Sequence, residues 1–132
     1  MISLTTTLKL LSPVFVLVGL IHLALGPEAE VLLGAELSPQ SLADPVLDSQ
    51  NRFYGVTFTV FGFLLYLCAT DIHKYAAVFY ICIWVIFAGG VARLISMAAA
   101  GIPSGFVIAL LAVEILAPVL LTLWYRNVQA ES

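Results

Sequence analysis

The chain has 132 residues, of which 62% are hydrophobic and 10% are charged, whereas about a quarter of the residues in a soluble domain are charged. This composition and the mean hydropathy of +1.10 predict a single all-α domain in a membrane. The net charge of -3, with five basic residues, leaves no cationic stripe to neutralise phosphates. Nucleic acid is therefore excluded as a partner.

Four apolar runs are long enough, at about 1.5 Å per helical residue, to cross or nearly cross a hydrocarbon core of about 30 Å. An external loop of about 25 residues, 27–51, joins the first two runs, and a short interfacial helix is expected within 27–37. The runs predict an integral membrane antiparallel four-helix bundle, with membrane spans at about residues 8–25, 53–70, 75–100 and 105–125.

The basic residues of the short connections predict how the bundle is oriented. Lys9, the turn 71–74 and Arg126 fall on one side, while the acidic residues of the long loop fall on the other, with Arg52 as the only cation there. We therefore expect both termini in the cytoplasm and a multi-pass protein of the bacterial inner (plasma) membrane.

The first apolar run has a second interpretation. Lys9, the apolar stretch and the small residues 24–26 resemble a cleavable signal peptide. Pro13 and His22 interrupt its apolar core, which favours a retained first helix. Cleavage after Gly26 would leave three spans.

Cysteine and histidine give no sign of a metal or cofactor site. Cys68 and Cys82 lie in apolar runs without a CxxC spacing, so they are interpreted as small hydrophobic residues. His22 and His73 fall near opposite ends of neighbouring spans, which argues against a haem held by two histidines. We predict neither a metal nor a cofactor.

Ionisable residues of the spans gather in the external half of the predicted bundle. His22 lies about one helical turn inside the first span, and Arg52 opens the second. Arg93 lies ~10 Å inside the third span and Glu114 ~15 Å inside the fourth. Because an isolated charge at mid-membrane costs about 2.5–3.5 kcal/mol, Arg93 and Glu114 are predicted to form an ion pair.

The polar stretch 50–55, QNRFYG, is interpreted as the rim of an outward-facing site whose floor is this ion pair. Gly90 shares a helix face with Arg93, which gives either close helix packing or room for a ligand. Pro118 cannot donate to the carbonyl of Glu114, which leaves an acceptor there. The candidate ligand-binding residues are His22, Gln50, Asn51, Arg52, Tyr54, Gly90, Arg93, Ser96 and Glu114.

Aromatic residues outside this set are interpreted by their depth. Trp84 falls deep enough in its span to belong to the core, whereas Trp124 with Tyr125 is expected to mark the inner interface.

Four short motifs together resemble those of a family of small bacterial four-span membrane proteins, domain of unknown function 4345. The resemblance covers roughly residues 22–124, implies the four-span fold, and implies no reaction. It draws attention to Arg52, Tyr54, Arg93 and Glu114. The motifs are DSQNRFYG at 48–55, GVARLIS at 90–96, GIP at 101–103 and EI at 114–115.

Three functions stay open at this point. The first is binding of a lipid, a quinone-like molecule or another hydrophobic ligand in the outward-facing polar pocket, or an accessory role in a homo-oligomer or larger membrane complex. The alternative is a membrane-embedded enzyme in which Glu114 or His22 acts as general acid or base and Arg93 stabilises an anion. A proton-coupled carrier using Glu114 ranks last, because the chain is short and lacks internal symmetry.

Overall fold

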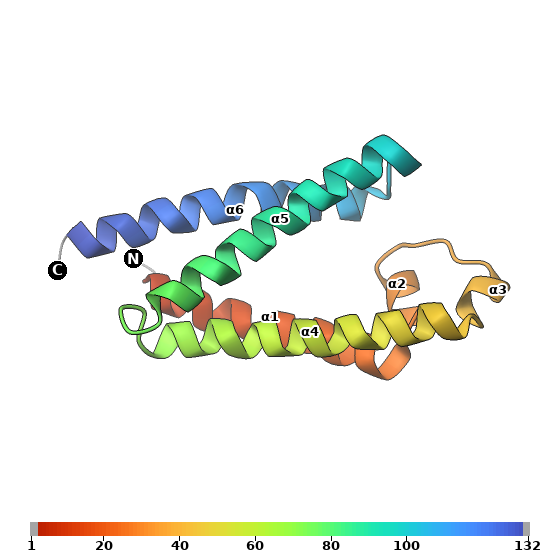
Figure 1. Ribbon diagram of the computed structural model, residues 1–132, viewed down its shortest axis with the longest axis horizontal. Coiled ribbons are helices and arrows are strands. Elements are labelled where there is room, and N and C mark those ends of the chain that lie inside the picture. The colour runs from red at the N-terminus through yellow and green to blue at the C-terminus, as the bar shows by residue number, and fades with distance from the viewer. Residues whose placement is uncertain (1–2, 131–132) are drawn as a thin grey trace.

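The computed structural model describes residues 3–130, and every regular element within them is an α-helix (Figure 1). Four helices are long and apolar enough to cross a membrane, which confirms the predicted all-α fold. They are α1 (Leu4–Leu25), α4 (Pro45–Thr70), α5 (Ala76–Ala100) and α6 (Gly105–Ala130). The short helices α2 (Glu28–Leu32) and α3 (Pro39–Leu42) lie between α1 and α4.

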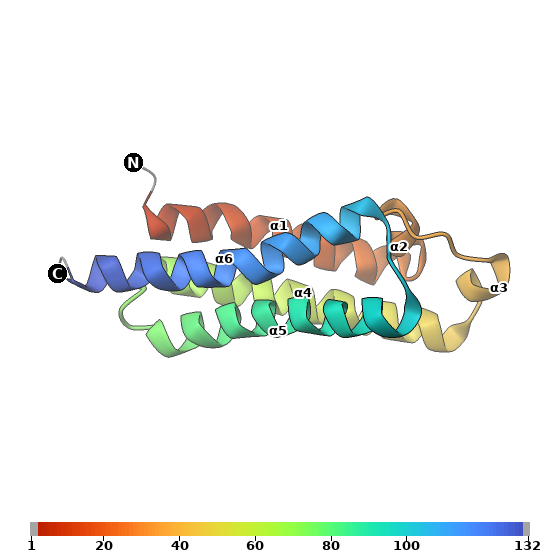
Figure 2. The ribbon, with the colours of Figure 1, turned by 90° about the horizontal axis from the view of Figure 1, so that it is seen from above.

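Consecutive long helices run in opposite directions (Figures 1 and 2). Both ends of the chain and the turn between α4 and α5 therefore lie at one end of the molecule, which we call the terminal end. The connection between α1 and α4, and the turn between α5 and α6, lie at the other end, which we call the loop end.

The start of α4 differs from the prediction. This helix begins at Pro45, and not at Phe53 as expected, because Asp44 caps it. The Asp44 carboxylate accepts hydrogen bonds from the backbone N–H groups of Val46 at 2.7 Å and Leu47 at 3.1 Å. Pro45 occupies the first helical position, where its missing N–H has no intrahelical partner to lose. The connection between α1 and α4 consequently spans 26–44, and residues 45–51 of the loop predicted over 27–51 belong to α4.

The close pairing of α1 with α4 depends on two glycines that face each other's helix. A Cβ atom on Gly19 would lie 2.5 Å from the backbone nitrogen of Thr59, and one on Gly55 would lie 2.5 Å from that of Leu23. Real Cβ atoms do not approach backbone so closely. The absence of side chains at Gly19 and Gly55 therefore lets the two helices touch along their backbones.

Helices α5 and α6 form a second pair, and Gly90 lies at their contact. A Cβ atom on Gly90 would lie 2.8 Å from Ile115 Cδ1 and 3.2 Å from Glu114 Cβ. Of the two interpretations that the sequence left open for Gly90, this geometry fits close helix packing.

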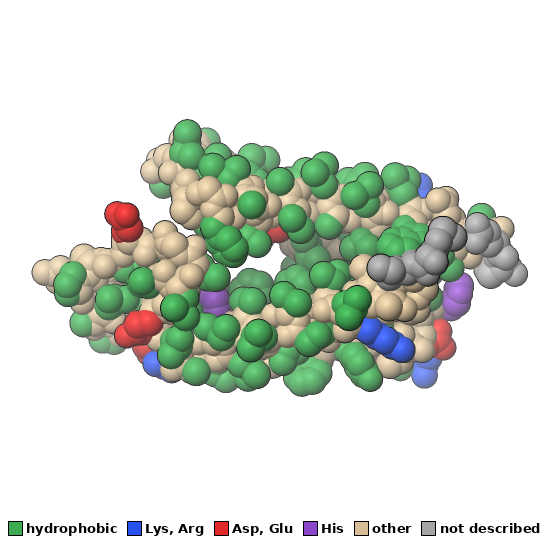
Figure 3. Space-filling model, turned by 180° about the vertical axis from the view of Figure 1, so that it is seen from behind, with side chains coloured by type: hydrophobic (Ala, Val, Ile, Leu, Met, Phe, Trp, Pro, Cys, Tyr) green, Lys and Arg blue, Asp and Glu red, His purple; other side chains and the backbone are tan. Residues whose placement is uncertain are grey.

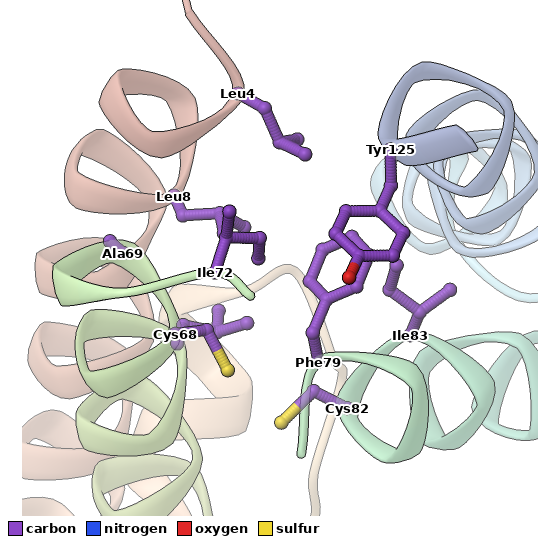
Figure 4. Close-up of a cluster of buried hydrophobic side chains, with 10 residues drawn as sticks. Leu4, Leu8, Cys68, Ala69, Ile72, Phe79, Cys82, Ile83 and Tyr125 are labelled. Carbon is purple, nitrogen blue, oxygen red and sulfur yellow. The ribbon is translucent and has the colours of Figure 1, made fainter. Parts of the chain in front are cut away.

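The hydrophobic core lies at the terminal end, where all four long helices meet (Figure 4). Tyr125, which was expected at the inner interface, is 0% exposed and packs within this core. Trp84 is 55% exposed and faces outward instead of belonging to the core. The buried side chains of this cluster are Leu4, Leu8, Leu65, Cys68, Ala69, Ile72, Phe79, Cys82, Ile83 and Tyr125.

Away from this core, the α1–α4 pair and the α5–α6 pair separate. Figure 1 shows α5 and α6 diverging from α1 and α4 toward the loop end. The space-filling view shows an opening between the two pairs, surrounded mostly by hydrophobic side chains, with an acidic side chain and a histidine at its margin (Figure 3). The bundle is therefore closed at the terminal end and open toward the loop end.

Candidate functional site

The predicted ion pair between α5 and α6 is present. Arg93 Nε donates a hydrogen bond of 2.7 Å to Glu114 Oε2. The side chains are 36% and 20% exposed, so neither charge is sealed inside protein. Pairing removes the cost that each charge would carry alone among apolar helices.

His22 forms a second polar contact, from the opposite pair of helices. Its Nδ1 lies 2.9 Å from the backbone carbonyl of Val18. A carbonyl oxygen only accepts, so Nδ1 carries the hydrogen. The other ring nitrogen, Nε2, lies 3.5 Å from Glu30 Oε1. In the neutral ring Nε2 offers a lone pair to this carboxylate, so the contact is attractive only when a proton sits on one of the two groups.

Arg52 fastens the start of α4 to the end of α1. Its guanidinium donates two hydrogen bonds of 2.9 Å to the Asp48 carboxylate. The same group donates to the backbone carbonyls of Leu23 at 2.7 Å and Ala24 at 3.2 Å. These carbonyls belong to the last turn of α1, where the helix itself supplies no donors. Arg52 therefore caps the C-terminus of α1. It is not among the residues that line the pocket at the loop end.

A pocket of about 580 Å³ lies at the loop end, between the connection that follows α1 and the facing ends of α5 and α6. Gly34 lies beside Ser104 across this space, at a φ of 92° that favours glycine. The pocket has three charged side chains in an otherwise mostly apolar wall. The lining residues are Glu30, Leu33, Gly34, Ala35, Glu36, Arg93, Ile102, Pro103, Ser104, Phe106, Val107 and Leu110.

Three of the predicted site residues belong to this region. Arg93 lines the pocket, Glu114 holds Arg93, and His22 reaches the wall through its contact with Glu30.

The other predicted residues lie elsewhere. Gln50, Ser96 and Tyr54 are exposed on helix surfaces, and the Tyr54 ring neighbours that of Phe53 at a centroid distance of 6.4 Å. Asn51 is buried, and its amide donates to the Leu47 carbonyl at 3.1 Å. Within residues 3–130, the amide oxygen of Asn51 has no hydrogen-bond partner. The stretch QNRFYG therefore joins α1 to α4 more than it forms the rim of the pocket.

Sequence reasoning missed most of the pocket wall. Glu30 and the segment 33–36 come from the external connection, and the segment 102–110 comes from the following turn and the start of α6. The predicted topology could have indicated the wall, because it placed both segments at the external end of the bundle.

The charged groups of the pocket are Arg93 and the carboxylates of Glu30 and Glu36, and they lie beside an apolar surface. Among the described residues, no three His, Cys, Asp or Glu side chains gather as a metal site would need.

Comparison with known proteins identifies one match. The family model described as domain of unknown function (DUF4345) matches residues 3–125. Neither the curated proteins nor the solved structures give a match. The matched range covers α1, α4, α5, most of α6 and every residue that lines the pocket. The chain therefore belongs to the DUF4345 family.

Proposed function

We propose that the chain binds an amphiphile, a membrane lipid or a quinone-like molecule, in the pocket at the loop end. The observation that carries this proposal is the position of Arg93 in the wall of a cavity of about 580 Å³ whose other walls are largely apolar. Small-molecule sites commonly combine an apolar lining with a few polar groups that fix the orientation of the ligand.

Arg93 supplies the contact for the head group of the ligand. A guanidinium has five N–H donors, and the contact with Glu114 engages the one on Nε. The terminal nitrogens keep donors for an acceptor oxygen. Arg93 therefore binds a head group without breaking its contact with Glu114.

The charge of the wall favours a neutral head group. Glu114 compensates Arg93, and the pocket also contains Glu30 and Glu36. A phosphate would meet these carboxylates without an uncompensated cation nearby. A carbonyl oxygen, as in a quinone or a glycerolipid ester, needs only a donor. We therefore rank neutral carbonyl ligands above anionic lipids.

The tail of the ligand has apolar surface to follow. Phe106, Val107 and Leu110 line the pocket on α6, and the opening between the helix pairs lies alongside (Figure 3). Burial of apolar surface contributes about 25 cal/mol per Å², so a chain of several methylene groups adds appreciably to binding.

The proposed orientation places the pocket outside the cell. Lys9, Lys74 and Arg126 belong to the terminal end, while Glu28 and Glu36 belong to the loop end. By the preference of basic residues for the cytoplasm, we propose a bacterial inner-membrane protein with both termini inside. The pocket then faces the periplasm or the outer leaflet.

Catalysis receives no support from the contacts of the described chain. Glu114 is held by Arg93, and His22 is held by Val18 and Glu30 on the other helix pair. Within residues 3–130, no hydrogen bond or ion pair joins Glu114 to His22, and a shared acid–base role would favour such a contact. The proposal is therefore limited to binding.

Mass spectrometry of the protein extracted from its own membranes in mild detergent tests the proposal. We expect a co-purified lipid or quinone, which Val107→Trp removes by filling the pocket that Val107 lines. Val113→Trp is the matched control, because Val113 lies on the same helix and is exposed. A wild-type chain without bound amphiphile, or equal occupancy in both variants, would overturn the proposal.

A further inference from the structure

The fold brings together two cysteines that the sequence spacing kept apart. Cys68 comes from the last turns of α4 and Cys82 from the beginning of α5, and both belong to the core at the terminal end. Their sulfur atoms point into the space between these helices (Figure 4). Both cysteines are free.

These thiols lie where the two helix pairs are joined. Helix α4 belongs to the pair with α1, and α5 belongs to the pair with α6, so a bond between Cys68 and Cys82 would connect the pairs covalently. The two residues flank a single turn of the chain, 71–75, which keeps the loop that a bond would close short. Cys68 Sγ also lies 3.9 Å from the Tyr75 carbonyl of this turn, an acceptor for its S–H.

We propose that Cys68 and Cys82 form a reversible disulfide that fixes α4 to α5 at the terminal end. The reaction breaks two S–H bonds and forms one S–S bond. Two electrons and two protons leave the thiols and pass to the two carbonyl oxygens of a quinone, which becomes the quinol. A dithiol reductant reverses the step by thiol–disulfide exchange.

The surroundings of the thiols determine the class of oxidant. Cys68 is 0% exposed and Cys82 is 1% exposed, and both lie within apolar helices that are long enough to span a membrane. Oxidants dissolved in water reach such a place poorly. A quinone dissolves in the lipid around these helices, so a quinone is the oxidant class that the site favours. This inference does not depend on a ligand in the pocket at the loop end.

Oxidation of the purified full chain in lipid nanodiscs tests the inference. The probes are a fully ring-substituted benzoquinone and, separately, diamide, a small thiol oxidant. After each treatment the protein is denatured, its remaining thiols are alkylated, and its intact mass is measured. We expect the wild type to lose both reactive thiols together, as a monomer, and to regain them with a dithiol reductant.

Two variants separate a disulfide from other oxidation products. Cys68→Ser and Cys82→Ser each keep one buried thiol, and we expect that thiol to stay free under the same treatment. The oxidised wild type should also unfold at a higher temperature than the reduced form, because a cross-link restricts the unfolded chain. Neither serine variant should show this shift.

Three results would overturn the inference. A disulfide needs Cβ atoms about 3.5–4.5 Å apart, so wild-type thiols that stay free with both oxidants would overturn the inference. Diamide treatment of the denatured chain provides the control that both thiols are chemically competent. Disulfides that form only between two chains, or an oxidised form that is less stable than the reduced one, would overturn it as well.

Discussion

Arg93 on α5 and Glu114 on α6 hold their Nε and Oε2 atoms 2.7 Å apart, although 21 positions separate them in the chain. One turn before Arg93, Gly90 lets α6 approach α5 closely enough for this contact. Arg93 also forms part of the pocket wall. The pair therefore fixes the second helix pair and also sets the polarity of the pocket.

Removing one partner of this pair should destabilise the protein more than removing both. Glu114→Gln leaves the Arg93 charge without its partner, and we expect the free energy of unfolding to fall by up to about 3 kcal/mol. The double variant Arg93→Met with Glu114→Met leaves no charge behind and should recover most of this loss. Thermal unfolding in detergent micelles measures the difference. Equal losses in the single and double variants would contradict the account.

Close packing of α1 on α4 predicts a strong effect at Gly19. Gly19→Ala introduces a Cβ atom against the backbone of Thr59, and overpacking of this kind costs about 1–3 kcal/mol. Gly89→Ala is the matched control, because a Cβ atom at Gly89 meets nothing within 4 Å. Thermal unfolding of both variants gives the comparison. A Gly19→Ala protein as stable as the control would show that the helices are not packed at this distance.

The contacts of Arg52 predict a local effect at the end of α1. Arg52→Gln removes the donors to the Leu23 and Ala24 carbonyls, so the last turn of α1 should open more often. Hydrogen–deuterium exchange measures this, and faster exchange is expected for the amides of residues 22–30. Gln50→Ala, at an exposed position of the same helix, should leave exchange unchanged. Similar exchange in both variants would remove this role from Arg52.

Much of the fold could be predicted because the lengths of the apolar runs determine how many long helices form and where they lie. The four long helices were found, and the Arg93–Glu114 pair followed from alternating helix directions and from the cost of an unpaired charge. The start of α4 was missed, because the prediction followed the apolar run from Phe53, and Asp44 and Pro45 lie before that run. Both residues are typical of a helix start.

The separation of the helix pairs and the pocket wall could not be predicted. Packing of α1 on α4 depends on where Gly19 and Gly55 meet, and a single sequence does not give the register of two helices. The pocket depends on the path of the segment 33–36, which includes Gly34 at positive φ. Such a segment has no periodicity to interpret. The burial of Tyr125 could not be predicted for the same reason, because the sequence gives its depth but not the direction of its side chain.

The contact between His22 and Glu30 predicts different rates of amide exchange in α2 for two variants of Glu30. Glu30→Ala removes the partner of Nε2, and the loss should amount to at most about 1 kcal/mol because Glu30 is partly exposed. Glu30→Gln keeps an N–H donor that can reach the lone pair of the neutral ring. Exchange of the α2 amides should therefore be slower in Glu30→Gln than in Glu30→Ala, because only the Gln variant keeps a partner for Nε2. The reverse order would contradict the assigned tautomer of His22.

Photo-crosslinking tests most directly whether an amphiphile occupies the pocket at the loop end. A photoactivatable quinone or a glycerolipid with a reactive group near its head is added to the protein in nanodiscs, and the labelled peptides are mapped. The account predicts labelling of residues 33–36 and 102–110, with loss of that labelling in Val107→Trp. Labelling confined to outward-facing positions such as Val113 and Leu116, and unchanged by Val107→Trp, would contradict it.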